Sequence, residues 1–168
     1  QAHGNAIKQL MELANLFKIP SVGITDKDDG DLITGTDNFY TTVKRDFEEE
    51  IVSLLESGNE NTLRTILLNY DNKGINRELE KDALNSRIFD RKGNDKYVLG
   101  FEKFTNSLKL VEIDNKNTQL LKVFYITWFS LNKSYPLGLL IGSSLELEQI
   151  PTIYKDIINR VKELAESV

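Results

Sequence analysis

The chain has 168 residues, of which 40% are apolar and 28% are charged, with a net charge of −5. These proportions are ordinary for a globular domain that buries a core. It contains no cysteine and a single histidine, His3, which excludes disulfides, thiolate metal sites, cysteine nucleophiles and a multi-histidine zinc site. Any metal site must therefore rest on carboxylates, which favours Mg²⁺, Mn²⁺ or Ca²⁺.

No apolar run reaches the roughly 18 residues of a membrane span, and no secretory signal is present. We therefore expect a cytoplasmic protein with no membrane partner, and we interpret the start at Gln1 as that of a fragment. The net charge argues against autonomous, strongly basic nucleic-acid binding. It does not exclude a nuclease, because bound cations offset the carboxylates of a metal site.

Apolar residues at helical spacing predict a first helix over residues 6–18, which Pro20 ends. Residues 21–25 are predicted to form a short strand, and the acidic run Asp26–Asp31 follows it directly. A loop or short hairpin is expected over residues 32–37. A helix followed by a strand with acids at its end is typical of α/β domains, which place chemistry at the carboxyl ends of strands.

The rest of the chain is predicted to be mostly helical. The next helix, capped by Thr41 or Thr42, carries the segment Asp46-Phe47-Glu48 and closes at Gly58. Residues 101–111 fit both a helix and a strand, and we favour the helix. Further helices are predicted over residues 61–69, 77–88, 119–131 and 137–145, and from Pro151 onward. The expected fold class is α/β in one domain, with an α/β part at 1–45 and a mostly helical part at 46–168.

Asp26 and Asp28 are the candidate chemical residues of the acidic run. Two carboxylates at positions i and i+2 after a strand can face one hard cation, which requires oxygen ligands. Such an ion activates water and stabilises the transition state of phosphodiester hydrolysis. By spacing alone, a solvated acidic turn explains the pair equally well. A calcium-binding EF-hand loop is disfavoured, because Asp31 occupies its sixth position, which needs glycine, and the preceding segment is strand-like.

The residues from Gly4 to Asp28 resemble the later part of a Toprim domain, where a helix leads into a strand ending in Asp-x-Asp. The version most similar to this sequence is that of the OLD (overcoming lysogenization defect) family of ATP-dependent endonucleases of bacterial and phage defence. Three segments carry this resemblance: Phe17-Lys18-Ile19-Pro20 before the acidic run, Asp46-Phe47-Glu48, and Lys133 with Pro136-Leu137-Gly138-Leu139 and Ile150-Pro151.

The resemblance implies a partial Toprim (Rossmann-like) parallel sheet with a large, mainly helical insertion and C-terminal helices. It implies hydrolysis of DNA with Mg²⁺ or Mn²⁺, for which Ca²⁺ would be an inactive substitute. Asp26, Asp28 and Glu48 would be metal ligands, and Lys133 would stabilise the developing phosphate charge.

Each carried-over role has a structural alternative. Glu48 would instead orient the water, or be an acid in the first helical turn that the helix dipole favours. Lys133 would be a cation at a helix C-terminus, and Asp46 would only cap its helix. Asp29 and Asp31 would contribute to a second metal or remain solvated.

The opening Toprim strand with its catalytic glutamate has no counterpart in this chain, and neither has the phosphate loop of the ATPase domain. We therefore expect the chain to be inactive alone. The expected partners are DNA, the ATPase domain of the full-length chain, and further copies joined through that domain. The alternative is an acidic-pocket regulatory or assembly module without catalysis. Asp26, Asp28 and Lys133 match part of the acidic pair and distant lysine of a receiver domain. The long helical stretch after residue 44 does not match, because a receiver alternates strands and helices to its end.

Overall fold

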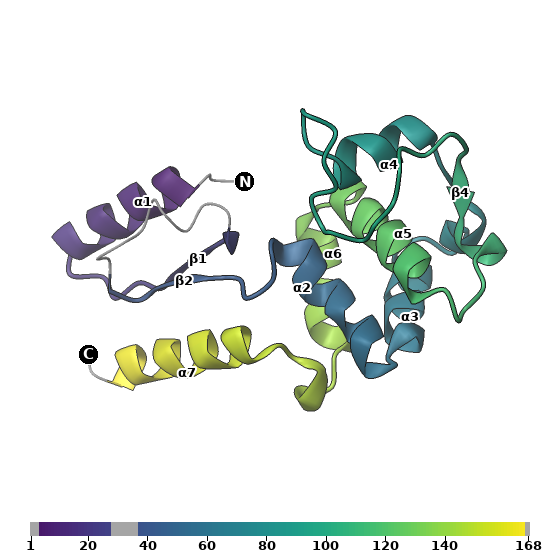
Figure 1. Cartoon of the computed structure of the whole chain (residues 1–168). Helices are drawn as coiled ribbons and strands as arrows, with labels where there is room; N and C mark the ends of the chain where they lie inside the picture. Colours follow the sequence, from purple (N-terminus) through teal and green to yellow (C-terminus); the bar gives the residue numbers. More distant parts are fainter. Residues whose placement is uncertain (1–3, 28–36, 167–168) are drawn as a thin grey trace. The chain divides into compact units, whose positions relative to one another are not determined.

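The computed structural model describes residues 4–27 and 37–166. His3, Asp28, Asp29, Asp31 and most of the expected loop at 32–37 lie outside the described residues. The fold is mixed α/β and mostly helical, with one parallel and one antiparallel two-stranded sheet, so the predicted fold class is confirmed. Contacts divide the chain into unit 1, residues 1–50 and 147–168, and unit 2, residues 51–146 (Figure 1). The expectation of a single domain stays a prediction.

Helices make up most of the described residues. The α-helices are α1 (Gly4–Leu16), α2 (Phe47–Val52), α3 (Glu60–Tyr70), α4 (Lys81–Ile88), α5 (Thr118–Leu131), α6 (Tyr135–Ser144) and α7 (Thr152–Glu166). Short 3-10 turns lie at η2 (Ser53–Ser57), η3 (Gly74–Asn76), η4 (Leu110–Glu112) and η5 (Leu147–Gln149). The strands are β1 (Gly23–Thr25), β2 (Phe39–Thr41), β3 (Glu78–Leu79) and β4 (Leu108–Lys109). None of the helices in residues 4–27 and 37–166 has the length and hydropathy of a membrane span.

Unit 1 is built on the parallel pair β1 and β2, in which Gly23 is opposite Phe39 and Thr25 is opposite Thr41. Helix α1 packs against β1 and α7 packs against β2, so the strands lie between two helices (Figure 1). Gly23 allows α1 to approach closely, because a Cβ there would stand 2.5 Å from the Met11 sulfur and 3.0 Å from a methyl of Ile7.

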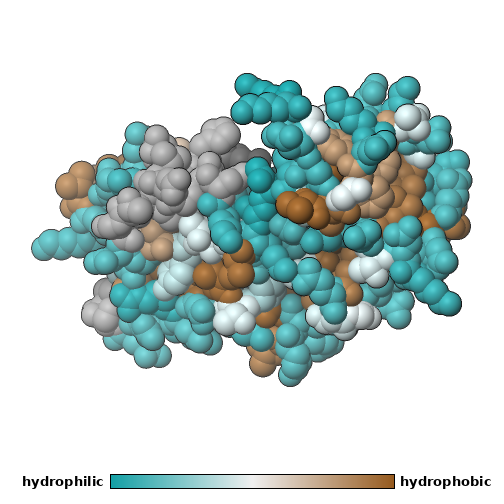
Figure 2. All heavy atoms as spheres, in the orientation of Figure 1, coloured by the Kyte–Doolittle hydropathy of each residue, from teal (hydrophilic) through white to brown (hydrophobic). Residues whose placement is uncertain are grey.

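Unit 2 is organised around α5, whose side chains are buried from Val123 to Phe129. Trp128, Tyr125 and Phe124 are its largest fully buried side chains. The Tyr125 hydroxyl donates to a carboxylate oxygen of Glu60 at 2.7 Å, which satisfies the phenol inside the core. Helices α3, α4 and α6, drawn around α5 in Figure 1, complete the unit. The face drawn in Figure 2 is mostly hydrophilic, with smaller hydrophobic areas.

The predicted helix over residues 101–111 is wrong. Apart from β4 and the turn η4, this segment is irregular. Two hydrogen bonds with the Asn85 side chain hold the Phe104 backbone. The Asn85 amide nitrogen donates to the Phe104 carbonyl at 2.9 Å, and the Phe104 N–H donates to the Asn85 amide oxygen at 2.8 Å. These bonds and the pairing of Lys109 with Glu78 use backbone groups that a helix would need.

Two further elements differ from the expectation. The helix predicted from residue 77 begins only at Lys81, because Glu78 and Leu79 form strand β3. The α2 cap is neither Thr41, which lies in β2, nor Thr42, whose hydroxyl donates to the Lys44 carbonyl at 2.9 Å. Asp46 caps α2 instead, since its carboxylate accepts the Glu49 N–H at 2.8 Å.

We predict that Gly23→Ala destabilises the protein by about 1–3 kcal/mol, because the added methyl overpacks the contact between α1 and β1. The matched control is Gly138→Ala in α6, where a Cβ meets nothing within 4 Å. That change should stabilise by about 0.5–1 kcal/mol through helix propensity. Thermal unfolding followed by circular dichroism measures both, and equal effects of the two substitutions would contradict the close approach.

Replacement of Val98 by glycine is expected to raise the stability of the protein. The Val98 side chain is 88% exposed and the residue's φ is 56°, a region that β-branched residues avoid. Val98→Gly should stabilise by up to about 1 kcal/mol, because relief of about 1–3 kcal/mol of strain exceeds the entropic cost of glycine. Val111→Gly is the control, since Val111 is 56% exposed without a positive φ and should lose stability. A loss of stability in the Val98 variant would contradict the strain.

Candidate functional site

Asp26 joins the end of β1 to the start of α2. The backbone ladder continues past β1, where the Thr42 N–H donates to the Thr25 carbonyl at 3.0 Å. The next residue, Asp26, accepts the Phe47 N–H on Oδ1 at 3.1 Å. Phe47 is the first residue of α2. The N–H groups in the first turn of a helix have no partner inside the helix and attract negative charge. The predicted position of Asp26 at a strand end is therefore confirmed, and its carboxylate has a defined orientation.

Carboxylates of α2 also fix the loop that leads into it. Glu50 accepts the Lys44 N–H at 2.8 Å, and Glu49 accepts the Arg45 N–H at 3.0 Å. The Arg45 carbonyl accepts the Lys27 N–H at 3.1 Å. Glu49 and Glu50 thus have a structural role, since they satisfy backbone donors of a connecting loop.

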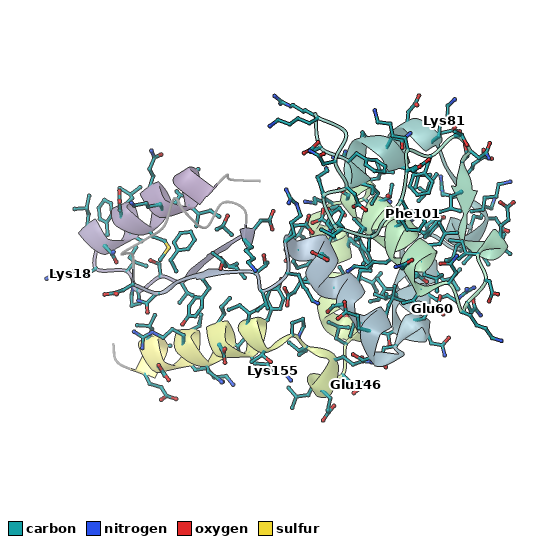
Figure 3. The ribbon with its side chains drawn as sticks, viewed as in Figure 1. Lys18, Glu60, Lys81, Phe101, Glu146 and Lys155 are labelled. Carbon is teal, nitrogen blue, oxygen red and sulfur yellow. The ribbon has the colours of Figure 1, made fainter. Side chains whose placement is uncertain are left out.

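The carboxylates of Asp26, Glu48 and Glu50, which we call the acidic cluster, act electrostatically on the phenol of Tyr154 on α7. Burial raises the pKa of Tyr154, and the nearby charges of Glu50, Asp26 and Glu48 raise it further. The Tyr154 ring packs edge-on against Phe47 with centroids 6.1 Å apart. Its hydroxyl is buried and has no hydrogen-bond partner among the described residues. The next residue on α7, Lys155, is labelled in Figure 3.

The structure brings together two of the predicted site residues. Asp26 and Glu48 both belong to the acidic cluster, and Glu48 is only 2% exposed. Asp28 lies outside the described residues. Lys133 is exposed between α5 and α6 in unit 2, so its role beside a phosphate stays a prediction.

The donors of the acidic cluster have the chemistry of a magnesium or manganese site. Hard divalent ions bind carboxylate oxygens, and Asp26, Glu48 and Glu50 supply them within unit 1. Within residues 4–27 and 37–166, however, no group of three histidine, cysteine or acidic side chains is arranged to hold a metal ion. Asp26 and Glu48 can thus supply part of such a site, for which Asp28 would be a further ligand.

Sequence reasoning missed Glu50 of the acidic cluster and also Tyr154, on whose phenol the cluster acts. Glu50 stands two positions after Glu48 in a run of three glutamates, and nothing in the run distinguishes it. Tyr154 belongs to an amphipathic helix, where its spacing indicates only a place on the packed face. Its contact with Phe47, a residue far away in the sequence, is not shown by any local pattern.

Comparison with protein-family models, curated proteins and solved structures finds no match for this chain. The resemblance to the OLD family and the roles that it implies therefore stay predictions.

We predict that Tyr154 makes the protein sensitive to alkali. Its pKa is raised above the value of about 10 that it has in the unfolded chain. Its contribution to stability is therefore intact below about pH 10 and is lost as the pH rises further. Tyr154→Phe should shift alkaline unfolding, followed by circular dichroism, to higher pH. The control Tyr135→Phe, with a ring that is 79% exposed, should leave the transition unchanged. Equal transitions for wild type and Tyr154→Phe would contradict the burial of this phenol beside carboxylates.

Proposed function

We propose that unit 1 carries the divalent-metal site of an enzyme that hydrolyses phosphodiester bonds of DNA. Asp26 and Asp28 are the proposed ligands, and Glu48 is a third ligand or the group that orients the attacking water. The supporting observation is that the Asp26 carboxylate accepts the N–H of Phe47, the residue before Glu48, so the two acids meet at the start of α2. Like charges that are taken out of water repel and lose hydration, and a bound cation offsets both costs.

The Asp26 carboxylate is oriented before any ligand binds. The Phe47 N–H holds one of its oxygens, so ion binding would cost little further side-chain entropy. Tyr154 is protonated at neutral pH, and its buried hydroxyl, which has no hydrogen-bond partner among the described residues, is free to donate to a ligand.

A bound Mg²⁺ or Mn²⁺ supplies a polarised water and positive charge for a transition state of this kind. In this proposal Glu48 would accept a proton from the water or ligate the ion. The resemblance to the OLD family supports DNA as the substrate and an ATPase domain of the full-length chain as the partner. It also supports an oligomer formed through that domain.

A regulatory or assembly module without catalysis is the second candidate. One observation favours it: Asp46, Glu49 and Glu50 accept backbone N–H groups at 2.8–3.0 Å. Acids used in this way stabilise a loop and need no metal. The two candidates differ in whether Asp26 and Asp28 bind a divalent ion.

We predict that Asp26→Asn/Asp28→Asn abolishes the binding of Mn²⁺, measured by electron paramagnetic resonance and calorimetry. Asparagine is the chosen replacement because its side-chain oxygen can still accept the Phe47 N–H, so the start of α2 is preserved. The expected melting temperature is therefore within a few degrees of wild type. Plasmid cleavage by the protein that includes its ATPase domain should be lost in the same variant.

Asp46→Asn is the matched control. It removes one negative charge near α2 but keeps an acceptor for the Glu49 N–H, so Mn²⁺ binding should persist. Retained Mn²⁺ binding in the Asp26/Asp28 variant, or its equal loss in the Asp46 variant, would contradict the proposed site and favour the regulatory module.

A further inference from the structure

Basic side chains gather at the end of α4 and on the loop that follows it. Arg87, Arg91, Lys92 and Lys103, which we call the basic loop surface, are all exposed. Residues 87–103 contain five basic and three acidic residues, a local charge of +2 in a chain of net charge −5. This segment therefore differs in charge from the rest of the chain.

The tip of this loop has a defined conformation. An isolated bridge pairs Phe89 with Asp95, and the Asp90 carboxylate accepts the N–H groups of Lys92 at 2.8 Å and Asn94 at 2.9 Å. Gly93 closes the turn with φ of 86°. The loop beside α4 in Figure 1 thus presents Arg91 and Lys92 on a fixed backbone.

Other contacts bring the remaining cations to the same place. The Lys103 ammonium lies 3.9 Å from where a Cβ would stand on Gly93, next to the tip. The Lys96 ammonium donates to the Ser86 carbonyl at 3.4 Å, which fastens the loop to the last turn of α4, where Arg87 lies. Lys103 therefore lies beside the tip, and the loop is fastened next to the end of α4 that carries Arg87.

The acids of the loop are directed at its own backbone. Asp95 accepts the N–H groups of Leu99 at 2.7 Å and Gly100 at 2.9 Å, as Asp90 does at the tip. Hydrogen bonds from the Asn94 side chain and from the neighbouring backbone lower the pKa of Asp90, which keeps this carboxylate ionised and bound to the turn. Of the three acids, Glu102 alone makes no such hydrogen bond within the described residues, so positive charge exceeds negative charge on the outer side of the loop.

We propose that the basic loop surface binds the phosphate backbone of duplex DNA. The choice of duplex DNA rests on the proposed function, whereas the choice of surface rests on the geometry of the loop. Arginine matches a phosphate with two parallel hydrogen bonds, and each phosphate neutralised releases condensed counterions from the duplex. A loop fixed before binding loses little entropy on contact. Contacts of this kind position the protein and carry no base preference.

The test is the binding of a fluorescent duplex to the chain, measured by anisotropy in EDTA at several salt concentrations. We predict that Arg91→Ala/Lys92→Ala weakens binding about tenfold or more. The slope of log affinity against log salt should fall by about 1.8, since each phosphate contact contributes about 0.9. The control Lys73→Ala/Lys116→Ala removes the same charge from exposed positions in other loops of unit 2 and should change neither quantity.

Three results would overturn the proposal: no binding of the duplex by the wild-type chain, unchanged binding in the Arg91/Lys92 variant, or an equal loss in the Lys73/Lys116 variant. Melting temperatures verify that each variant is folded, and none of the four substituted side chains is buried. Mn²⁺ binding is measured in parallel on the same variants. A failure of the DNA surface is then distinguishable from a failure of the metal site, because Arg91 and Lys92 belong to unit 2.

Discussion

Unit 1 depends on the hydrogen bond from the Phe47 N–H to the Asp26 carboxylate. Two parallel strands of three residues each bury little surface and would not persist alone. Side-chain acceptors instead hold the connection from β1 to α2. Asp26 accepts the Phe47 N–H at the start of α2, and Glu50 accepts the Lys44 N–H in the loop before it. A hydrogen bond to a charged group contributes about 1.5–3 kcal/mol, so a few such bonds can compensate for a small sheet.

This dependence sets a limit on how the site can be altered. Asp26 is both the acceptor that starts α2 and the proposed ligand, so its removal changes the fold and the chemistry together. Replacement by asparagine separates the two, because a cap needs only an acceptor oxygen and a metal ligand also needs charge. The two roles cannot be separated at Glu50, because this residue is only 5% exposed and its carboxylate fixes the loop at Lys44. An alanine scan of the acidic cluster would thus confuse folding with metal binding.

The helices whose positions depend on a local apolar periodicity could be predicted from the sequence. Apolar spacing located α1, α3, α5, α6 and α7, and the position of Asp26 after a strand followed from the same reasoning. It missed β2, because three residues show no alternation that could distinguish a strand from a loop. It also misassigned residues 101–111, where the spacing fits a helix but the Asn85 side chain holds the backbone open. Tyr154 could not be predicted, since its neighbours come from elements far away in the chain.

Net charge alone does not decide binding, for a related physical reason. The value of −5 argued against autonomous nucleic-acid binding, yet a phosphate responds to charges within about 10 Å at 0.1 M salt. Acids that accept backbone N–H groups, such as Asp90, are directed inward and contribute less to the outer field than their number indicates. Arg91 and Lys92 on the same turn have no such inward partner for their side chains in the described residues. The arrangement of charge around each loop, rather than its sum, decides which polyanion a chain of this kind can bind.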